Sequence, residues 1–193
     1  MELIKRLWKW LRLQHPIVIL RAVVVACLNY IPYAGSRRDP ERRQHVPLLI
    51  GKPQIALLLI LDGEQTLDPI RIMKGLFLFS METPEQLLPS SERYDFIPYS
   101  FGPYSYRIDR DLDQLVEHGY VKISKKAGKS WNYYYLSEKG KREAQELSSD
   151  MPPQAIAYLR KIRAFVLSVS FTRLLDTIYA KYPRFAAKSV YKY

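Results

Sequence analysis

Three lysines gather in one short segment whose flanks have the composition of β-strands. Lys125, Lys126 and Lys129 lie around a glycine, between the strand-like residues 120–124 and 131–136. This pattern predicts a β-hairpin with lysines at its tip. Such a tip could lay the three amines along the phosphates of a nucleic acid. Hairpin tips also favour polar residues without any ligand, so a purely structural role stays open.

The segment before this hairpin carries charges of both signs at helical spacing. Arg107 and Arg110 are predicted to be exposed and could reach base edges in a DNA groove. Four carboxylates are predicted to share the exposed surface of the same helix: Asp109, Asp111, Asp113 and Glu117. Carboxylates repel phosphates, so this helix also suits a protein partner, with Asp109 and Asp113 as contact residues.

Residue types that catalyse reactions or bind metals are sparse. The histidines, His15, His45 and His118, are far apart in sequence and lack the spacing of metal ligands. Cys27 is the single cysteine and lies in an apolar run, where it is expected to pack as a small hydrophobe. No Gly-x-Ser-x-Gly, His-Glu-x-x-His or phosphate-binding glycine loop occurs. The sequence therefore predicts a non-catalytic protein without a metal or other cofactor.

Apolar periodicity and capping residues predict the helices that must hold these side chains. Residues 54–62 form a short apolar stretch typical of a buried helix. Asp68 and Pro69 have the identities of an N-cap and a first helical residue, which predicts a second helix that ends at about Glu82.

The third helix is expected over 103–118, with Pro103 in its first turn and Gly119 at its end. The hairpin follows, and Ser137 then caps a helix that ends at about Leu147. Three helices, a two-stranded hairpin and a further helix follow each other in the order of a winged helix-turn-helix.

Several motifs at these positions share their residues with one protein family: Lys74–Phe79 (KGLFLF), Tyr99–Ser105 (YSFGPYS), Asp111-Leu112 with Leu115, Gly119–Val121, Ile178-Tyr179 and Tyr182-Pro183. The chain thereby resembles the SocA-like antitoxin family, also called Panacea, over residues 53–185. The resemblance implies a small intracellular prokaryotic protein that neutralises a toxin or, as an adaptor, delivers it to a protease. It also implies a mobile-element or defence setting. Residues 1–52 have no counterpart in the family pattern.

Composition and charge limit the remaining choices. The chain has 193 residues, 48% of them hydrophobic and 25% charged, which excludes wholesale disorder. Its net charge of +11 is uneven: residues 1–53 carry +7, residues 54–150 carry −3 and residues 151–193 carry +7. Such asymmetry favours a nucleic acid, an acidic partner or an anionic surface.

The N-terminal extension has an amphipathic start. Leu7, Trp8 and Leu11 share one helical face, opposite lysines and arginines. This face is expected to dock on a core or a protein partner, whereas attachment to a membrane surface is the weaker hypothesis.

We therefore predict an α+β, mostly α-helical protein: a basic N-terminal extension (1–52), a winged-helix-like core (53–150) and a basic helical C-terminal segment (151–193). The leading hypothesis is a cytoplasmic DNA-binding regulator or defence-associated subunit, which uses Arg107, Arg110 and the three lysines. The alternative is an antitoxin-like or adaptor module that binds a toxin or another protein. A homodimer is compatible with both hypotheses.

Overall fold

A computed structural model describes residues 48–191. These residues belong to one compact unit. The described residues contain six α-helices and two small antiparallel sheets, which confirms the predicted α+β, mostly helical class. The predictions for Leu7, Trp8 and Leu11 lie outside the described residues, as do those for the rest of 1–47.

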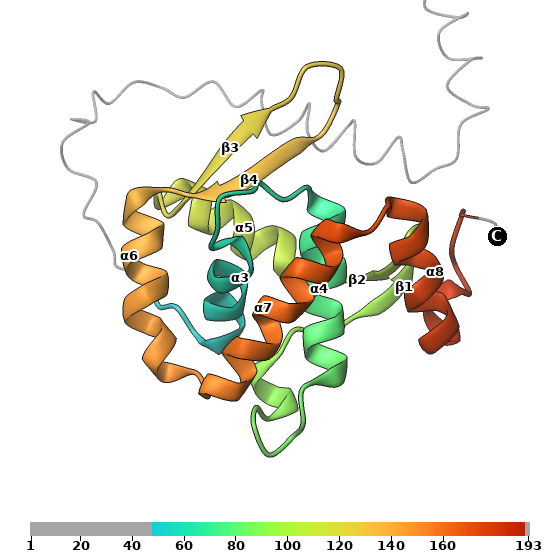
Figure 1. Cartoon of the computed structure of the whole chain (residues 1–193), viewed down its shortest axis with the longest axis horizontal. Coiled ribbons are helices and arrows are strands. Elements are labelled where there is room, and N and C mark those ends of the chain that lie inside the picture. The colour runs from blue at the N-terminus through green and yellow to red at the C-terminus, as the bar shows by residue number, and fades with distance from the viewer. Residues whose placement is uncertain (1–47, 192–193) are drawn as a thin grey trace, which may run out of the picture. The chain divides into compact units, whose positions relative to one another are not determined.

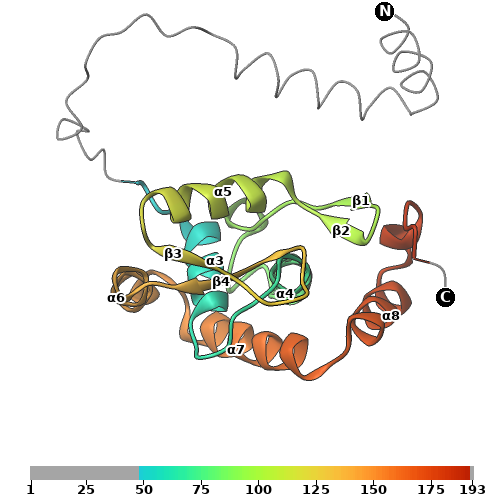
Figure 2. The ribbon, with the colours of Figure 1, turned by 90° about the horizontal axis from the view of Figure 1, so that it is seen from above.

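Helix α3 (Lys52–Leu61) lies at the centre of the unit. Its residues from Ile55 to Leu61 are all apolar, and none is more than 7% exposed. A helix that is apolar on every side needs neighbours on every side. Helices α4, α5, α6 and α7 and strand β4 all contact it. Figure 2 shows α3 and α4 between α5 on one side and α7 on the other.

Helix α4 (Pro69–Glu82) begins where the sequence predicts. The Asp68 carboxylate accepts a hydrogen bond from the Arg71 backbone N–H at 2.9 Å, and Pro69 occupies the first turn. This cap satisfies one of the backbone donors that a helix start leaves unpaired.

The segment before the third helix differs from its prediction. Pro103 does not lie in a helix: strands β1 (Ile97–Tyr99) and β2 (Gly102–Tyr104) form a tight hairpin, and α5 (Tyr106–Glu117) begins only after Ser105. Gly102 turns this hairpin with φ of 83°, and a Cβ there would lie 2.7 Å from the Tyr179 ring. Tyr104, which falls within the predicted helix 103–118, is therefore a strand residue.

The predicted lysine-tipped hairpin is present. Strands β3 (Val121–Lys125) and β4 (Asn132–Leu136) pair antiparallel, with Val121 opposite Leu136. Leu67 and Tyr134 exchange two backbone hydrogen bonds of 3.0 and 2.8 Å, so β4 is held on its other edge as well. The far end of the hairpin projects beyond the helices (Figure 1).

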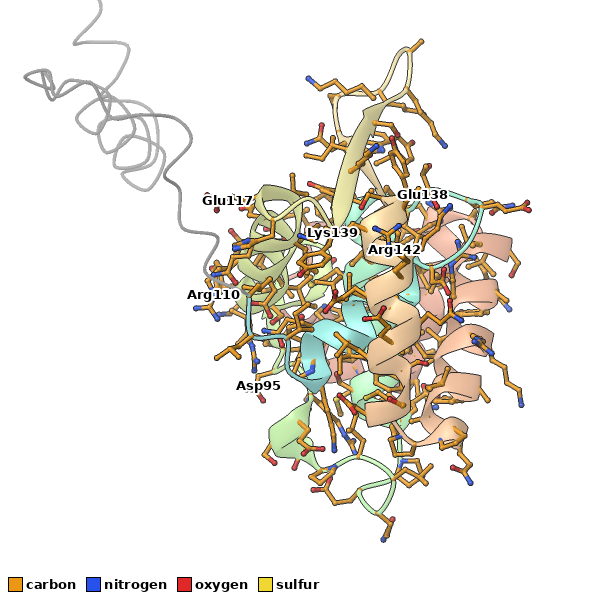
Figure 3. The ribbon with its side chains drawn as sticks, turned by 90° about the vertical axis from the view of Figure 1, so that its left-hand side faces the viewer. Asp95, Arg110, Glu117, Glu138, Lys139 and Arg142 are labelled. Atoms are coloured by element: carbon orange, nitrogen blue, oxygen red, sulfur yellow. The ribbon has the colours of Figure 1, made fainter. Side chains whose placement is uncertain are left out.

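Helix α6 (Glu138–Leu147) packs tightly against the base of this hairpin. The Ser137 hydroxyl accepts from the Gly140 N–H at 3.0 Å and donates to the Gly119 carbonyl at 2.6 Å, as its predicted capping role requires. Lys139 Nζ donates to the His118 carbonyl at the end of α5, at 2.9 Å. A cation at that position also interacts favourably with the helix dipole. Lys139 lies beside α5 in Figure 3.

Helices α7 (Pro153–Ser168) and α8 (Phe171–Lys181) complete the unit, with short 3-10 turns at Ser90–Glu92, Ser148–Asp150 and Pro183–Ala186. Glu82 at the end of α4 joins them: it accepts from the Tyr158 and Tyr182 hydroxyls and pairs with Lys181 at 2.8 Å. None of the described helices has the length and apolar character needed to cross a membrane.

Gly140 gives a direct test of this packing. A Cβ at this position would lie 2.0 Å from the Tyr120 carbonyl oxygen, so Gly140→Ala must push α6 away from the hairpin. We expect a loss of roughly 2 kcal/mol or more in the free energy of unfolding, measured by urea denaturation. Gln145→Ala, at an exposed position of the same helix, is the control and should change it by less than about 0.5 kcal/mol. Equal losses of unfolding free energy in the two variants would contradict the close contact between Gly140 and Tyr120.

Candidate functional site

Helix α5 buries one of the four carboxylates that the sequence analysis places on its surface. Asp111 is only 2% exposed, so the prediction that it faces solvent is wrong. Its carboxylate accepts from the Tyr94 hydroxyl at 3.0 Å and lies 3.5 Å from Arg107 Nε and 3.7 Å from Arg110 Nε. Burial, followed by the neighbouring Asp111 charge, raises the pKa of Tyr94 well above its usual value. Tyr94 therefore stays a hydroxyl donor to this carboxylate.

The buried Asp111 carboxylate attracts both of the arginines that are predicted to contact DNA. Arg107 and Arg110 share the Asp111 charge, and the Arg107 guanidinium also lies 5.5 Å from the centre of the Tyr94 ring. Arg110 still reaches solvent, with 67% of its side chain exposed on the outer side of α5 (Figure 3). Both arginines thus neutralise an internal charge in addition to any external contact.

The outer surface of α5 is acidic. Asp109, Asp113 and Glu117 are exposed and four residues apart, so they form one stripe along the helix. Within residues 48–191, neither Asp113 nor Glu117 forms an ion pair or a hydrogen bond through its side chain. The two predicted partner-contact residues of this helix, Asp109 and Asp113, therefore lie together on one accessible stripe.

Three tyrosines extend this stripe at the start of the helix. The Tyr99 and Tyr104 rings stack at 4.9 Å, and Tyr106 meets Tyr104 edge-on at 4.9 Å. The Tyr104 hydroxyl donates to the Asp109 carboxylate. Burial and that carboxylate raise the pKa of Tyr104. We call the stripe and these tyrosines together the α5 face.

A buried lysine positions the β1–β2 hairpin that carries two of these tyrosines. Lys74, on α4, is 3% exposed and donates from Nζ to the Pro103 carbonyl oxygen at 2.8 Å. Removal of the amine from water lowers the pKa of Lys74 from 10.5 to about 7. The bond joins the middle of α4 to β2, so it sets where the hairpin lies relative to the helices.

The predicted nucleic-acid lysines lie apart from the α5 face, at the tip of the β3–β4 hairpin. Lys125, Lys126 and Lys129 are all exposed. Lys126 Nζ lies 4.1 Å from the centre of the Tyr133 ring, and Lys129 Nζ lies 5.2 Å from that of Trp131. The five predicted DNA-contacting residues therefore occupy two places rather than one continuous row.

Phe101, Trp131 and Phe171 line one groove. Sequence reasoning did not single out Trp131 or Phe171, and it gives Phe101 only as part of the YSFGPYS motif. These side chains come from three separate segments, and no local pattern indicates that they meet.

Within the described residues, no group of three or more His, Cys, Asp or Glu side chains is arranged to hold a metal ion. No protein-family model and no curated protein matches this chain. The resemblance to the SocA-like antitoxins therefore stays a prediction that rests on its motifs.

The buried Lys74 predicts a specific dependence of stability on pH. Since its pKa is about 7 in the folded protein and 10.5 when unfolded, the unfolded chain binds more protons between these values. The free energy of unfolding must then rise with pH across that window. Relative to Lys74→Met, the wild-type protein should gain about 2 kcal/mol between pH 7 and pH 9, measured by urea denaturation. If the free energies of unfolding of the two proteins change with pH in parallel, Lys74 does not change its protonation between pH 7 and pH 9.

Proposed function

We propose that residues Lys52–Leu147 form a winged helix-turn-helix. The order of elements supports this assignment: α3, α4 and α5 precede the β3–β4 hairpin, which is the wing. The isolated bridge between Leu67 and Tyr134 supports it further, because it holds the segment between α3 and α4 against the other edge of β4. In this fold α5 is the helix that would enter a DNA groove.

We infer that the protein is a non-catalytic, protein-binding module that acts in the cytoplasm as an antitoxin-like protein or an adaptor. The observation that carries this inference is the sign of the charge on α5. Asp109, Asp113 and Glu117 would face the phosphates on both sides of a DNA groove, whereas Arg107 and Arg110 share the buried Asp111. Such a helix suits the basic surface of a protein better than a nucleic acid.

The tyrosines of the α5 face support the same function. Tyr106 is 58% exposed, and Tyr99 is 40% exposed. Tyrosine is common among the residues that dominate binding energy in protein interfaces, because its large ring also carries a hydrogen-bonding hydroxyl. The resemblance to the SocA-like antitoxins agrees with a toxin or another protein as the partner.

Photo-crosslinking from the α5 face tests this function. With benzoyl-phenylalanine in place of Tyr106, the full chain should crosslink to one protein in its native host, whereas the same probe in place of Gln145 should not. The captured protein, once purified, should bind the wild-type chain stoichiometrically, as measured by calorimetry. Asp113→Lys should weaken that binding at least tenfold, because it places like charges opposite each other.

Glu146→Lys makes the same charge change at an exposed position of α6, away from the α5 face, and is the control. If both lysine variants bind equally, or if both probe positions capture the same proteins, the α5 face is not the interface.

A second candidate function, DNA binding, is favoured by one observation: the three lysines are exposed at the end of a projecting hairpin. In this alternative the wing contacts phosphates. A labelled duplex titrated across a salt series should show a log–log slope that is smaller by about 2.7 when all three lysines are changed to Ala. The control replaces three exposed cations elsewhere: Arg160, Lys161 and Lys188. An equal change in both variants, or no binding at low salt, would exclude DNA contact by the wing.

A further inference from the structure

The tip half of the β3–β4 hairpin borders an aromatic groove that no part of the proposed interface uses. Its volume is about 660 Å³. Trp131 and Tyr133 line it from the hairpin, Phe101 from the β1–β2 turn and Phe171 from the start of α8. These segments meet near the first turn of α4, which adds Ile70 (Figure 1). Pockets of this size and apolar lining are typical of binding sites.

The aromatic side chains of the groove are unusually accessible. Phe101 and Trp131 are each 45% exposed. The Phe101 and Phe171 rings meet edge-on at 6.1 Å, so the wall is a packed surface rather than two independent side chains. Large apolar residues that are gathered in one hollow and left in contact with water mark a site for a partner.

The free charge in the lining of the groove is positive, because Lys129 lines it and Asp68 is the single acidic residue among those that do. The Asp68 carboxylate already accepts from the Arg71 backbone N–H and, at 2.6 Å, from the Arg71 guanidinium. The adjoining hollow on the other side of Tyr133 adds both Lys126 and Glu64. An acidic ligand would therefore meet Lys129 and no unpaired carboxylate in the groove, and Lys126 at its border.

The positions of the two lysines also favour a peptide over a nucleobase as the ligand. The amines of Lys126 and Lys129 lie over the ring faces of Tyr133 and Trp131, at 4.1 and 5.2 Å from their centres. A base that stacks on these faces would have to displace the amines. A side chain that enters between Phe101 and Trp131 would not, and carboxylates beside it would meet the amines where they are.

We propose that this groove binds an acidic segment of a partner protein. The segment inserts one aromatic or large aliphatic side chain among Phe101, Trp131 and Phe171, and it sets flanking carboxylates against Lys126 and Lys129. This site takes the opposite charge from the α5 face, so it is a second surface with a different ligand. It does not depend on the function proposed for α5.

Selection from a random-peptide phage library against the full chain tests the proposal. The selected peptides should contain a large apolar residue flanked by Asp or Glu. Calorimetry with one selected peptide should show binding at least tenfold weaker for Trp131→Ala, and also for the double change Lys126→Glu and Lys129→Glu. Binding to wild type should weaken with salt, and the Trp131 indole N–H signal in NMR spectra, assigned with Trp131→Phe, should shift.

Matched controls lie on the other face of the same hairpin. Ile123 is 43% exposed, so Ile123→Ala removes a side chain of similar exposure, and Lys125→Glu makes the same charge change as each of the two lysine substitutions. Both controls should bind the peptide as wild type does, and so should Asp113→Lys on the α5 face. Peptides without acidic residues, or equal binding by Trp131→Ala, would overturn the proposal. So would a thymidine 15-mer that binds wild type and is lost with Trp131→Ala, because the groove would then be a nucleic-acid site.

Discussion

The burial of α3 on every side is the constraint on which the rest of the fold depends. A helix with seven consecutive apolar residues, Ile55–Leu61, cannot leave any face in water without a large free-energy cost. The elements that cover it therefore have few alternatives: α4 and α7, then α5, α6 and β4, must all reach it. The chain that leaves α3 passes β4, where Leu67 meets Tyr134, and this contact sets the direction in which the lysine-tipped hairpin projects.

A second constraint links the two candidate surfaces. The β1–β2 hairpin is joined to α4 by the buried bond between Lys74 and the Pro103 carbonyl. Its strands present Tyr99 and Tyr104 to the start of α5, whereas its turn presents Phe101 to the aromatic groove. One hairpin thus contributes to both surfaces. The amine carries an N–H donor in either protonation state, so this one buried side chain links the position of the hairpin to α4.

Sequence reasoning succeeded where the signal is local. Asp68 and Ser137 cap helices because each accepts from an N–H three residues later, and such a contact needs no tertiary structure. Sequence reasoning failed where a residue distant in the sequence determines the local structure or the burial of a side chain. Pro103 favours a helix start, but its pairing with Pro98 and its bond to Lys74 hold it in a strand. Asp111 is buried because Tyr94 and two arginines lie around it, and the groove combines segments 30 to 40 residues apart, at Phe101, Trp131 and Phe171.

The distribution of charge decides between the modes of binding that this architecture allows. A duplex that takes α5 into its groove would bring phosphates to both the acidic stripe and the lysines of the hairpin. The lysines would attract it, and Asp109, Asp113 and Glu117 would repel it over the whole length of the helix. Protein surfaces occur with either sign, so a basic surface suits the α5 face and a separate acidic segment suits the lysines. The aromatic residues beside each place would then contribute most of the affinity, and the opposite charges would fix the orientation of each partner.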